Sequence, residues 1–297
     1  MTTQSPGTDE STQWTLQMLL DLFDAKPAGA NKFIVPSGLA TADERQVVEG
    51  TQVLAAAIVA AAKRFPEKSV RSVTAVFARA VMVGPPVELD LDVISEGRTT
   101  ATAVITASQS GKRCVSVTVL ADVPSGDVIR HHLPIPDVAG PAQANISHMP
   151  MTGRELRLVD IEDVNSPDEV GPPQIHAWLY YEPVPRRDDM AKALIAYFTG
   201  HLGISTTMRA HEGIGTAQAH LTVSTAPMTI AVSFHEPVRW EGWLLYSHES
   251  TQVGAGMSYV RGTVHTEAGE LIASFSQDAL IRPLRTTDTG IAEQSRL

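Results

Sequence analysis

A glutamine stands near the end of the last apolar stretch of the sequence, in the run ASFSQDAL at residues 273–280. The alternate positions before it are Leu271, Ala273 and Phe275, which places Gln277 on the apolar face of a predicted strand. An amide on an apolar face costs roughly 1–3 kcal/mol unless its hydrogen bonds are met. Gln277 is therefore either a satisfied core amide or a functional group that orients a water or donates to an oxyanion.

Catalysis would need a carboxylate or an imidazole beside this amide, because glutamine is no base near neutral pH. The run Gly256–Val260 lacks the final glycine of a nucleophile elbow, and Gly213–Gly215 lacks the third glycine of a dinucleotide fingerprint. There is no H-E-x-x-H motif and no Walker loop, and the histidines are scattered. The single cysteine, Cys114, excludes an all-cysteine metal site. We therefore expect neither a metal nor a cofactor.

Apolar periodicity predicts the elements that would position Gln277. The helices expected are an amphipathic one at residues 13–24, an alanine-rich buried one at Val53–Phe65 and a second buried one at Asp188–Thr199. Strands are expected at residues 72–80, 87–95, 99–108, 112–123, 156–164, 174–182, 221–235, 243–250, 257–266 and 271–283. Each buried helix is thus followed by a set of strands.

The two halves of the sequence repeat one pattern. Phe77 is followed twenty residues later by Gly97, and Phe234 is followed twenty residues later by Gly254. The buried helices also match, and the next hairpin glycines match with an offset of one residue. We interpret this as an internal duplication of a helix wrapped by a curved antiparallel sheet. The alternative is a mixed sheet of two unrelated halves. In the duplicated arrangement, Gln277 stands where the first copy has Val119.

Composition limits the class of protein. The chain has 297 residues, 43% of them hydrophobic, and a net charge of -10, so it has ample core and no dominant basic groove for nucleic acid. Its longest apolar run has ten residues, too few to cross a bilayer of roughly 30 Å. The first residues lack the features of a signal peptide, and we expect a cytoplasmic location. The expected divisions are a disordered N-terminus at 1–12, a first unit at 13–123, a Pro- and Gly-rich linker at 124–150, a second unit at 151–285 and a tail at 286–297.

Several runs resemble the acyl-CoA thioesterase II (TesB-like) family. They are RQVVEGTQV at residues 45–53, WLLYS at 243–247, EST at 249–251, YVRG at 259–262 and the run from Gly269 to Gln277. The resemblance spans about residues 14–285 and is strongest in 234–283. It implies an α+β double hotdog, in which two helix-wrapped antiparallel sheets lie in one chain. It also implies a hydrolase of fatty acid metabolism that cleaves acyl-CoA to CoA and a carboxylate, with CoA as part of the substrate, and a homo-oligomer.

The family's site resembles a trio around a water: an aspartate late in the second helix, a hydroxyl on the next strand and a glutamine on the last strand. Gln277 matches the glutamine, whereas the aspartate position is Gly200. Counting back from the end of the strand at 221–235 gives Pro227 for the hydroxyl. Thr225 and Thr229 flank it and would share one face of a strand, so either could supply the hydroxyl.

Gly200 cannot polarise a water, and loss of a positioned base costs about 10²–10⁴-fold in rate. Glu49 could compensate, because the start of a helix keeps a carboxylate ionised. His201 lies about 100° around the helix from position 200, and Asp278 should face away from Gln277. A plain capping or surface role is the alternative for all three residues. Arg261, within a family run, is a candidate for the phosphates of CoA.

Three functions follow from these residues. The first is a thioesterase that works weakly because the usual aspartate is replaced. The alternative is a protein that binds acyl-CoA or an acyl chain without hydrolysing it, and Gly200 favours this alternative. A hydratase or dehydratase acting on enoyl thioesters ranks last, because it needs an Asp/His pair that the sequence does not place.

Overall fold

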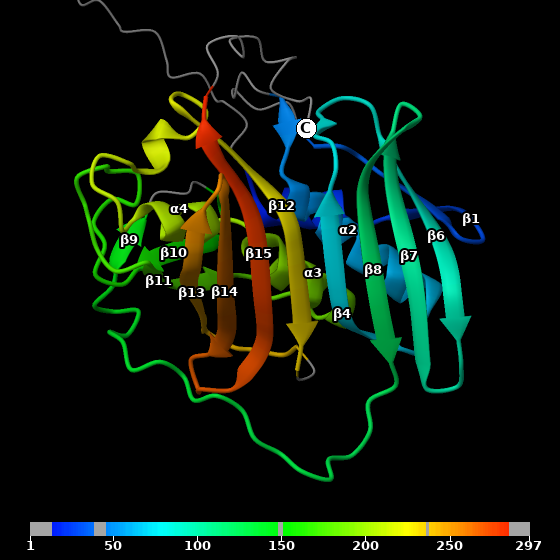
Figure 1. Ribbon diagram of the computed structural model, residues 1–297. Helices are drawn as coiled ribbons and strands as arrows, with labels where there is room; N and C mark the ends of the chain where they lie inside the picture. The colour runs from blue at the N-terminus through cyan, green and yellow to red at the C-terminus, as the bar shows by residue number, and fades with distance from the viewer. Residues whose placement is uncertain (1–13, 39–45, 148–150, 236–237, 285–297) are drawn as a thin grey trace, which may run out of the picture.

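The computed structural model describes residues 14–38, 46–147, 151–235 and 238–284. The predicted N-terminus at 1–12 and tail at 286–297 lie outside these residues. Thirteen strands form one antiparallel sheet, and the long helices pack on one of its faces (Figure 1). In the described part of the chain, no helix combines the length and the apolar character needed to span a bilayer.

The elements of the first half are α1 (Leu16–Phe23), β1 (Lys26–Gly29), β2 (Lys32–Val35), β3 (Val47–Val48), α2 (Gly50–Arg64), β4 (Ser69–Phe77), β5 (Val81–Met82), β6 (Val87–Glu96), β7 (Thr100–Gln109) and β8 (Lys112–Asp122). Those of the second half are β9 (Asn145–Ser147), β10 (Arg154–Leu158), β11 (Gln174–Tyr181), α3 (Asp188–Phe198), α4 (Gly203–Met208), β12 (Val223–Phe234), β13 (Trp243–Gly254), β14 (Met257–Thr266) and β15 (Leu271–Pro283). Strands β3 and β5 form a separate small sheet.

The large sheet contains one strand order twice. Outward from β4 the first half runs β8, β7, β6, β2 and β1, and outward from β12 the second runs β15, β14, β13, β11 and β10. Strands β4 and β12 pair with each other and join the halves. Val119 pairs with Val73 of β4 just as Gln277 pairs with Ile230 of β12. The fold is therefore the α+β double hotdog that the sequence predicted.

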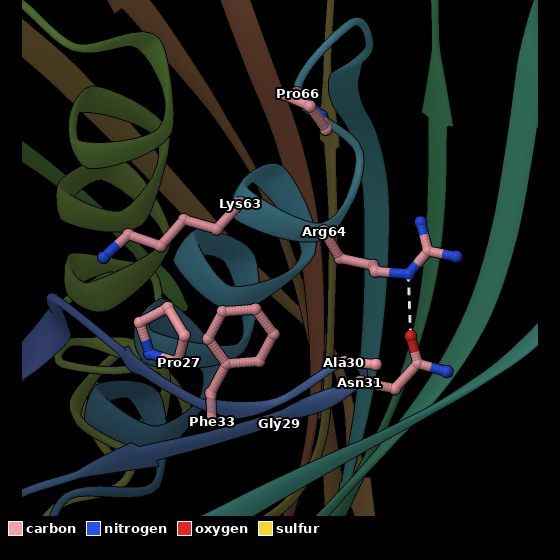
Figure 2. Close-up of a pocket in the computed structure, with 8 residues that line it drawn as sticks. All are labelled: Pro27, Gly29, Ala30, Asn31, Phe33, Lys63, Arg64 and Pro66. Carbon is pink, nitrogen blue, oxygen red and sulfur yellow. Dashed lines mark hydrogen bonds between the residues drawn. The ribbon is translucent and has the colours of Figure 1, made fainter.

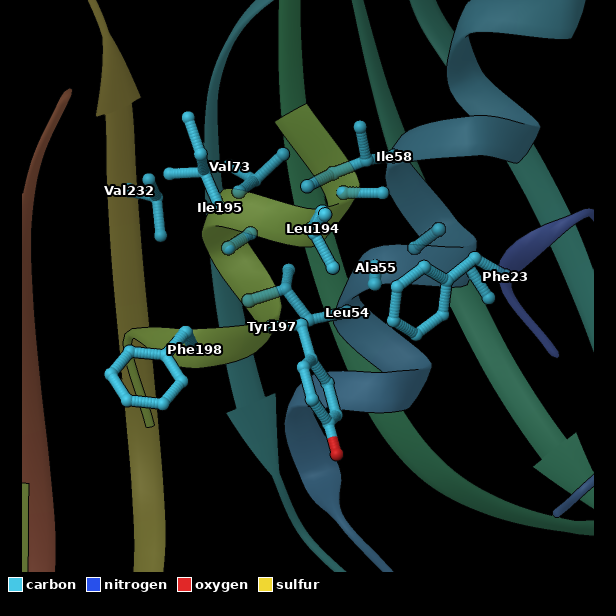
Figure 3. Close-up of a cluster of buried hydrophobic side chains, with 14 of the residues drawn as sticks. Phe23, Leu54, Ala55, Ile58, Val73, Leu194, Ile195, Tyr197, Phe198 and Val232 are labelled. Carbon is cyan, nitrogen blue, oxygen red and sulfur yellow. The ribbon is translucent and has the colours of Figure 1, made fainter. Parts of the chain in front are cut away.

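Helices α2 and α3 lie antiparallel to each other between the two copies. Ser69, which follows the end of α2, donates a hydrogen bond of 2.7 Å to Asp188 at the start of α3. Alanines on both helices are fully buried and let the helices approach closely: Ala55, Ala57, Ala60, Ala61, Ala193 and Ala196. Figure 3 shows larger side chains of the same core, with Ile58 of α2 beside Leu194 of α3.

The structure extends the predicted set of elements. It adds the hairpin of β1 and β2 and the short helix α4, which the sequence did not predict. Helix α2 begins at Gly50 rather than Val53, because its first turn is polar and hides the apolar period. The segment between β8 and β9 runs as an extended chain beside the sheet (Figure 1). Within it, the Ala139 carbonyl accepts a hydrogen bond of 2.9 Å from the Trp178 indole.

Candidate active site

Gln277 lies on the inner face of β15, under the helices. It pairs with Ile230 of β12 on one side and with Val260 of β14 on the other, and its residue surface is 1% exposed. Among the described residues, neither its Nε2 nor its Oε1 has a hydrogen-bond partner. A buried unpartnered amide is costly and needs an explanation, such as a water or a ligand group that it binds in function.

Helix α4 covers this amide. It lies over β13, β14 and β15, and its first residue, Gly203, sits directly on Gln277. A Cβ atom at position 203 would lie 1.8 Å from Oε1 of Gln277, which no real side chain could do. Thr207, one turn further along α4, shares a hydrogen bond of 3.0 Å with Ser250 of β13. Glycine at position 203 thus lets the backbone of α4 close over the glutamine.

The space beside Gly200 is filled from the other half of the molecule. A Cβ atom at position 200 would lie 2.6 Å from Cγ2 of Thr51 in α2 and 3.2 Å from Cδ1 of Ile230. Because Ile230 also pairs with Gln277, both Gly200 and Gln277 adjoin this one residue. Thr51 is buried and was not singled out from the sequence, although it belongs to the run RQVVEGTQV that resembles the family.

Thr225 and Thr229 do not lie beside Gln277. A bulge after Pro227 shifts the register of β12, so Thr225 pairs with Ile281 whereas Thr229 pairs with Asp278. Ile281 and Asp278 are three residues apart on β15, so their side chains lie on opposite faces of the sheet. The threonines that pair with them also lie on opposite faces, and the expectation that they share a face is wrong.

Each threonine hydroxyl has another neighbour. Thr229 donates a hydrogen bond of 2.5 Å to Oδ2 of Asp278 on the outer face. The Thr225 hydroxyl lies 3.4 Å from Nε2 of His220. Thr225 shares the face of Gln277, but its partner Ile281 is four residues further along β15, about 13 Å away.

Glu49 and His201 meet where the start of α2 faces the end of α3. Oε2 of Glu49 lies 3.3 Å from Nε2 of His201, and the His201 side chain is 6% exposed. Nδ1 of His201 lies 3.1 Å from the carbonyl oxygen of Tyr197. The imidazole stacks on Phe198 with 4.9 Å between ring centroids. The His201 side chain therefore faces the carboxylate of Glu49 in the other half.

Glu49 lies at the mouth of this cluster. Protein surrounds it on most sides, yet 54% of its side-chain surface is open to solvent, so water reaches the carboxylate. Burial by itself would raise the pKa of Glu49, but the charge and hydrogen bond of His201 outweigh it and lower the pKa to about 2. A hydrogen bond from Tyr197 and the charge of Arg154 act in the same direction. Burial and the nearby Glu49 charge raise the pKa of Tyr197.

Arg261 lies on the outer face of the sheet. It pairs with Ser276 of β15, whose side chain faces away from that of Gln277. Its guanidinium makes an ion pair of 2.9 Å with Glu249, and its side chain is 62% exposed. The structure therefore separates Arg261 from Gln277 by the thickness of the sheet.

A cleft of about 450 Å³ lies at the far end of α2, against the hairpin of β1 and β2 (Figure 2). In it, Arg64 donates to the Asn31 amide oxygen at 2.7 Å, and Lys63 bonds to Asp24 at 2.8 Å. A helix of 15 residues is about 22 Å long, which separates this cleft from Glu49. Within the described residues, no histidine, cysteine and carboxylate side chains gather as a group that could bind a metal ion.

Comparison with known proteins adds to this geometry. The relative "Acyl-CoA thioesterase 2" of Haemophilus influenzae is 26% identical over 257 residues, which covers 80% of this chain and 88% of that protein. The solved tesB protein of Mycobacterium avium subs paratuberculosis has a TM-score of 0.77 and 21% identity, covering 91% of this chain and 100% of that one. A protein with a hot dog fold from Alicyclobacillus acidocaldarius has a TM-score of 0.72 and 19% identity, covering 90% of this chain and 98% of that one.

Two family descriptions together match most of the chain. The acyl-CoA thioesterase N-terminal domain matches residues 42–121, from just before α2 to near the end of β8. The acyl-CoA thioesterase C-terminal domain matches residues 133–281, which include Gly200 and Gln277. The two matched regions correspond to the two copies of the hotdog unit. The chain therefore belongs to the acyl-CoA thioesterase family, in the TesB-like thioesterase II group that its motifs predicted.

Proposed function

We propose that this chain hydrolyses acyl-CoA to free CoA and a carboxylate, with Gln277 as the amide that holds the reacting groups. Membership of the family supports the class of substrate. The observation that carries the proposal is the buried Gln277 amide, whose two polar atoms have no partner among the described residues. A water or a thioester oxygen would supply the missing hydrogen bonds.

The amide suits this reaction because it both donates and accepts. Its Oε1 can accept a hydrogen bond from the attacking water, and its Nε2 can donate to the oxygen that becomes negative when water adds to the thioester. The C–S bond then breaks and CoA leaves. Water and side chains suffice for these steps, so we propose a reaction without a metal or cofactor, in which CoA belongs to the substrate. Without a carboxylate at position 200, we expect the rate to be low for the family.

The test measures release of CoA from acyl-CoAs of increasing chain length, with a thiol reagent as the readout. Gln277→Met keeps the size of the side chain and removes an amide that has no partner in the unliganded site. We therefore expect unchanged or higher thermal stability and a loss of about 10²–10³-fold in kcat. The proposal fails if no chain length gives turnover above the uncatalysed rate.

The matched control is Gln109→Met. Gln109 is also a buried glutamine, at 7% exposure, but it bonds to Met82 and Pro85 in the first half. Its replacement should lower the melting temperature, because those backbone groups lose their partner, and should leave kcat unchanged. This opposite pattern separates a functional glutamine from a structural one.

A second candidate function is the binding of acyl-CoA without hydrolysis, which Gly200 favours because glycine supplies no base. Calorimetry with an acyl-CoA would distinguish the two. Binding without turnover supports the second candidate, and absence of both binding and turnover contradicts the two together. A cytoplasmic location and assembly into homo-oligomers stay predictions of the family resemblance.

A further inference from the structure

The cluster around Glu49 and His201 supplies an acid and a base beside the place where the family's aspartate is missing. We propose that Glu49 and His201 act as the acid–base pair of the thioesterase reaction, with Glu49 taking a proton from water and His201 giving one to the leaving thiolate. This inference rests on the proposed hydrolysis and adds two catalytic residues to it. Neither belongs to the trio that the family resemblance implies.

Both ring nitrogens of His201 face oxygen atoms. Its Nδ1 faces the Tyr197 carbonyl oxygen at 3.1 Å, and its Nε2 faces a carboxylate oxygen of Glu49 at 3.3 Å. Both neighbours are acceptors, so either ring nitrogen can donate to one of them when it carries a proton. The rings of Phe198 and Tyr197 hold this imidazole in place, with centroid distances of 4.9 Å and 4.7 Å. The Nε2 edge of the ring therefore faces the carboxylate directly and is placed to exchange a proton with it.

Glu49 is suited to remain a carboxylate. It is the N-cap residue of α2, where the helix dipole favours negative charge, and its side chain makes no capping hydrogen bond. The titratable and charged groups that face it are His201 and Tyr197 from the α3 side, Arg154 of β10 and Tyr181 of β11. The positive charges hold its pKa near 2. Its side chain is about half exposed, so water can approach the carboxylate.

The pair lies beside the rest of the candidate site. His201 directly follows Gly200, and Glu49 precedes Thr51 by two residues at the start of the same helix. Thr51 and Gly200 are in contact, with 2.6 Å between Cγ2 and the Cβ position. Ile230 links Gly200 to Gln277. The two members of the pair are therefore near neighbours in the chain of the two residues, Gly200 and Thr51, that meet beside Ile230.

The proposed steps balance in atoms and charge. Water oxygen forms a bond to the thioester carbon while Glu49 takes one water proton, and the carbonyl electrons move to the oxygen as an oxyanion. The oxyanion re-forms the carbonyl, the C–S bond breaks, and the sulfur of CoA takes the proton of His201 Nε2. Glu49 then passes its proton to His201, which restores the pair. The carboxylic acid product loses its remaining proton to solvent.

The first test is Glu49→Gln, which keeps the size of the side chain and removes the base. We expect kcat for CoA release to fall about 10²–10⁴-fold with little change in KM. Glu96→Gln is the matched control, because Glu96 also pairs with a cation of α2, Arg64 at 2.9 Å, but at the other end of the helix. Its kcat should stay at the wild-type value. Thermal melting of both variants shows whether they remain folded.

The second test separates catalysis from a structural role through the pH profile. The wild-type pKa of Glu49 is about 2, so kcat/KM should stay level on the acid side until pH 4 or below. His201→Asn removes the main lowering influence, so Glu49 should titrate toward its ordinary value of 4.5 or above, because burial still raises it. The residual kcat/KM of this variant should therefore fall as pH decreases through that value. Tyr197→Phe should move the acid limb in the same direction by less.

The outcomes distinguish this inference from the proposed function. If wild-type protein releases no CoA, both the function and the pair are overturned. If wild-type protein is active and Glu49→Gln retains its kcat, only the pair is overturned. An acid limb that does not move in His201→Asn also overturns it. If that variant is too slow to profile, the acid dependence of its melting temperature reports the same Glu49 pKa.

Discussion

The space beside Gly200 is occupied in this chain by a neighbour from the first half. The methyl group of Thr51 lies where the side chain of residue 200 would begin, at 2.6 Å from the Cβ position. Glycine at position 200 and threonine at position 51 therefore depend on each other sterically. The sequence shows that residue 200 is a glycine, but it does not show that the Thr51 side chain fills the space beside it.

A carboxylate at position 200 should be accepted only if Thr51 is reduced. Gly200→Asp alone should lower stability by about 1–3 kcal/mol, because the Thr51 methyl and the Ile230 side chain already fill the space that the new side chain needs. Gly200→Asp with Thr51→Ser removes the methyl and should recover the melting temperature. CoA release should rise above wild type only in the double variant.

Thr51→Ser alone is the control and should change stability by less than Gly200→Asp. Two observations would contradict the prediction: a Gly200→Asp protein as stable as wild type, or equal CoA release by the single and double aspartate variants. Either result would mean that Thr51 does not limit residue 200.

A candidate site residue could be found from the sequence where the two copies of the repeat differ. Comparison with Val119 was enough to single out Gln277, since both lie on the same face of matching strands. Thr225 and Thr229 were misjudged because the bulge after Pro227 leaves no mark in the sequence. The contact of Glu49 with His201 was not predictable, because it depends on how two helices from different halves pack.

At the scale of elements, α4 covers Gln277 and separates it from solvent on the helix side of the sheet. The sequence predicted α2 and α3 from their apolar residues and buried alanines, but GISTTM is too short and too polar to show a helical period. The hairpin KPAGANKFIV at residues 26–35 likewise lacks a clear alternation. The hairpin extends the edge of the large sheet beyond β6, and α4 packs on β13, β14 and β15, so packing against the rest of the fold decides both structures.

Gly203→Ala tests the close contact of α4 with Gln277. Helix propensity alone favours alanine over glycine by about 0.5–1 kcal/mol. The structure predicts the opposite, because the new Cβ would lie 1.8 Å from Oε1 of Gln277. We expect a lower melting temperature and a lower rate of CoA release. Removal of the amide in Gln277→Ala with Gly203→Ala should recover stability, so the free energies of unfolding should be non-additive. Additive free energies would contradict the contact.

At the scale of the whole molecule, the two hotdog units share one sheet and one core. Strands β4 and β12 continue the ladder from one unit to the next, and α2 packs on α3 across the same boundary. Figure 3 shows Val73 and Val232 of the two central strands beside Ile195 of α3. We therefore expect the described core to unfold as one cooperative unit rather than as two domains.

Ile195→Ala tests this cooperativity. Ile195 is fully buried, so its truncation should lower the free energy of unfolding by about 2–5 kcal/mol. The single cysteine, Cys114, reports on the first half through its reactivity with thiol reagents in denaturant. Fluorescence of Trp178, Trp240 and Trp243, measured in a Trp14→Phe background, reports on the second half. Both probes should shift together to a lower denaturant concentration, and a shift of only one would contradict a single unit.

The contact between Thr51 and Gly200 also has a consequence for recombination between relatives. A chimera that joins this first half to the second half of a family member with aspartate at the matching position would bring that side chain against the Thr51 methyl. The reverse chimera would leave an unfilled space where the methyl had been. The residues at positions 51 and 200 must therefore fit each other. We expect a stable chimera only when both residues come from the same parent.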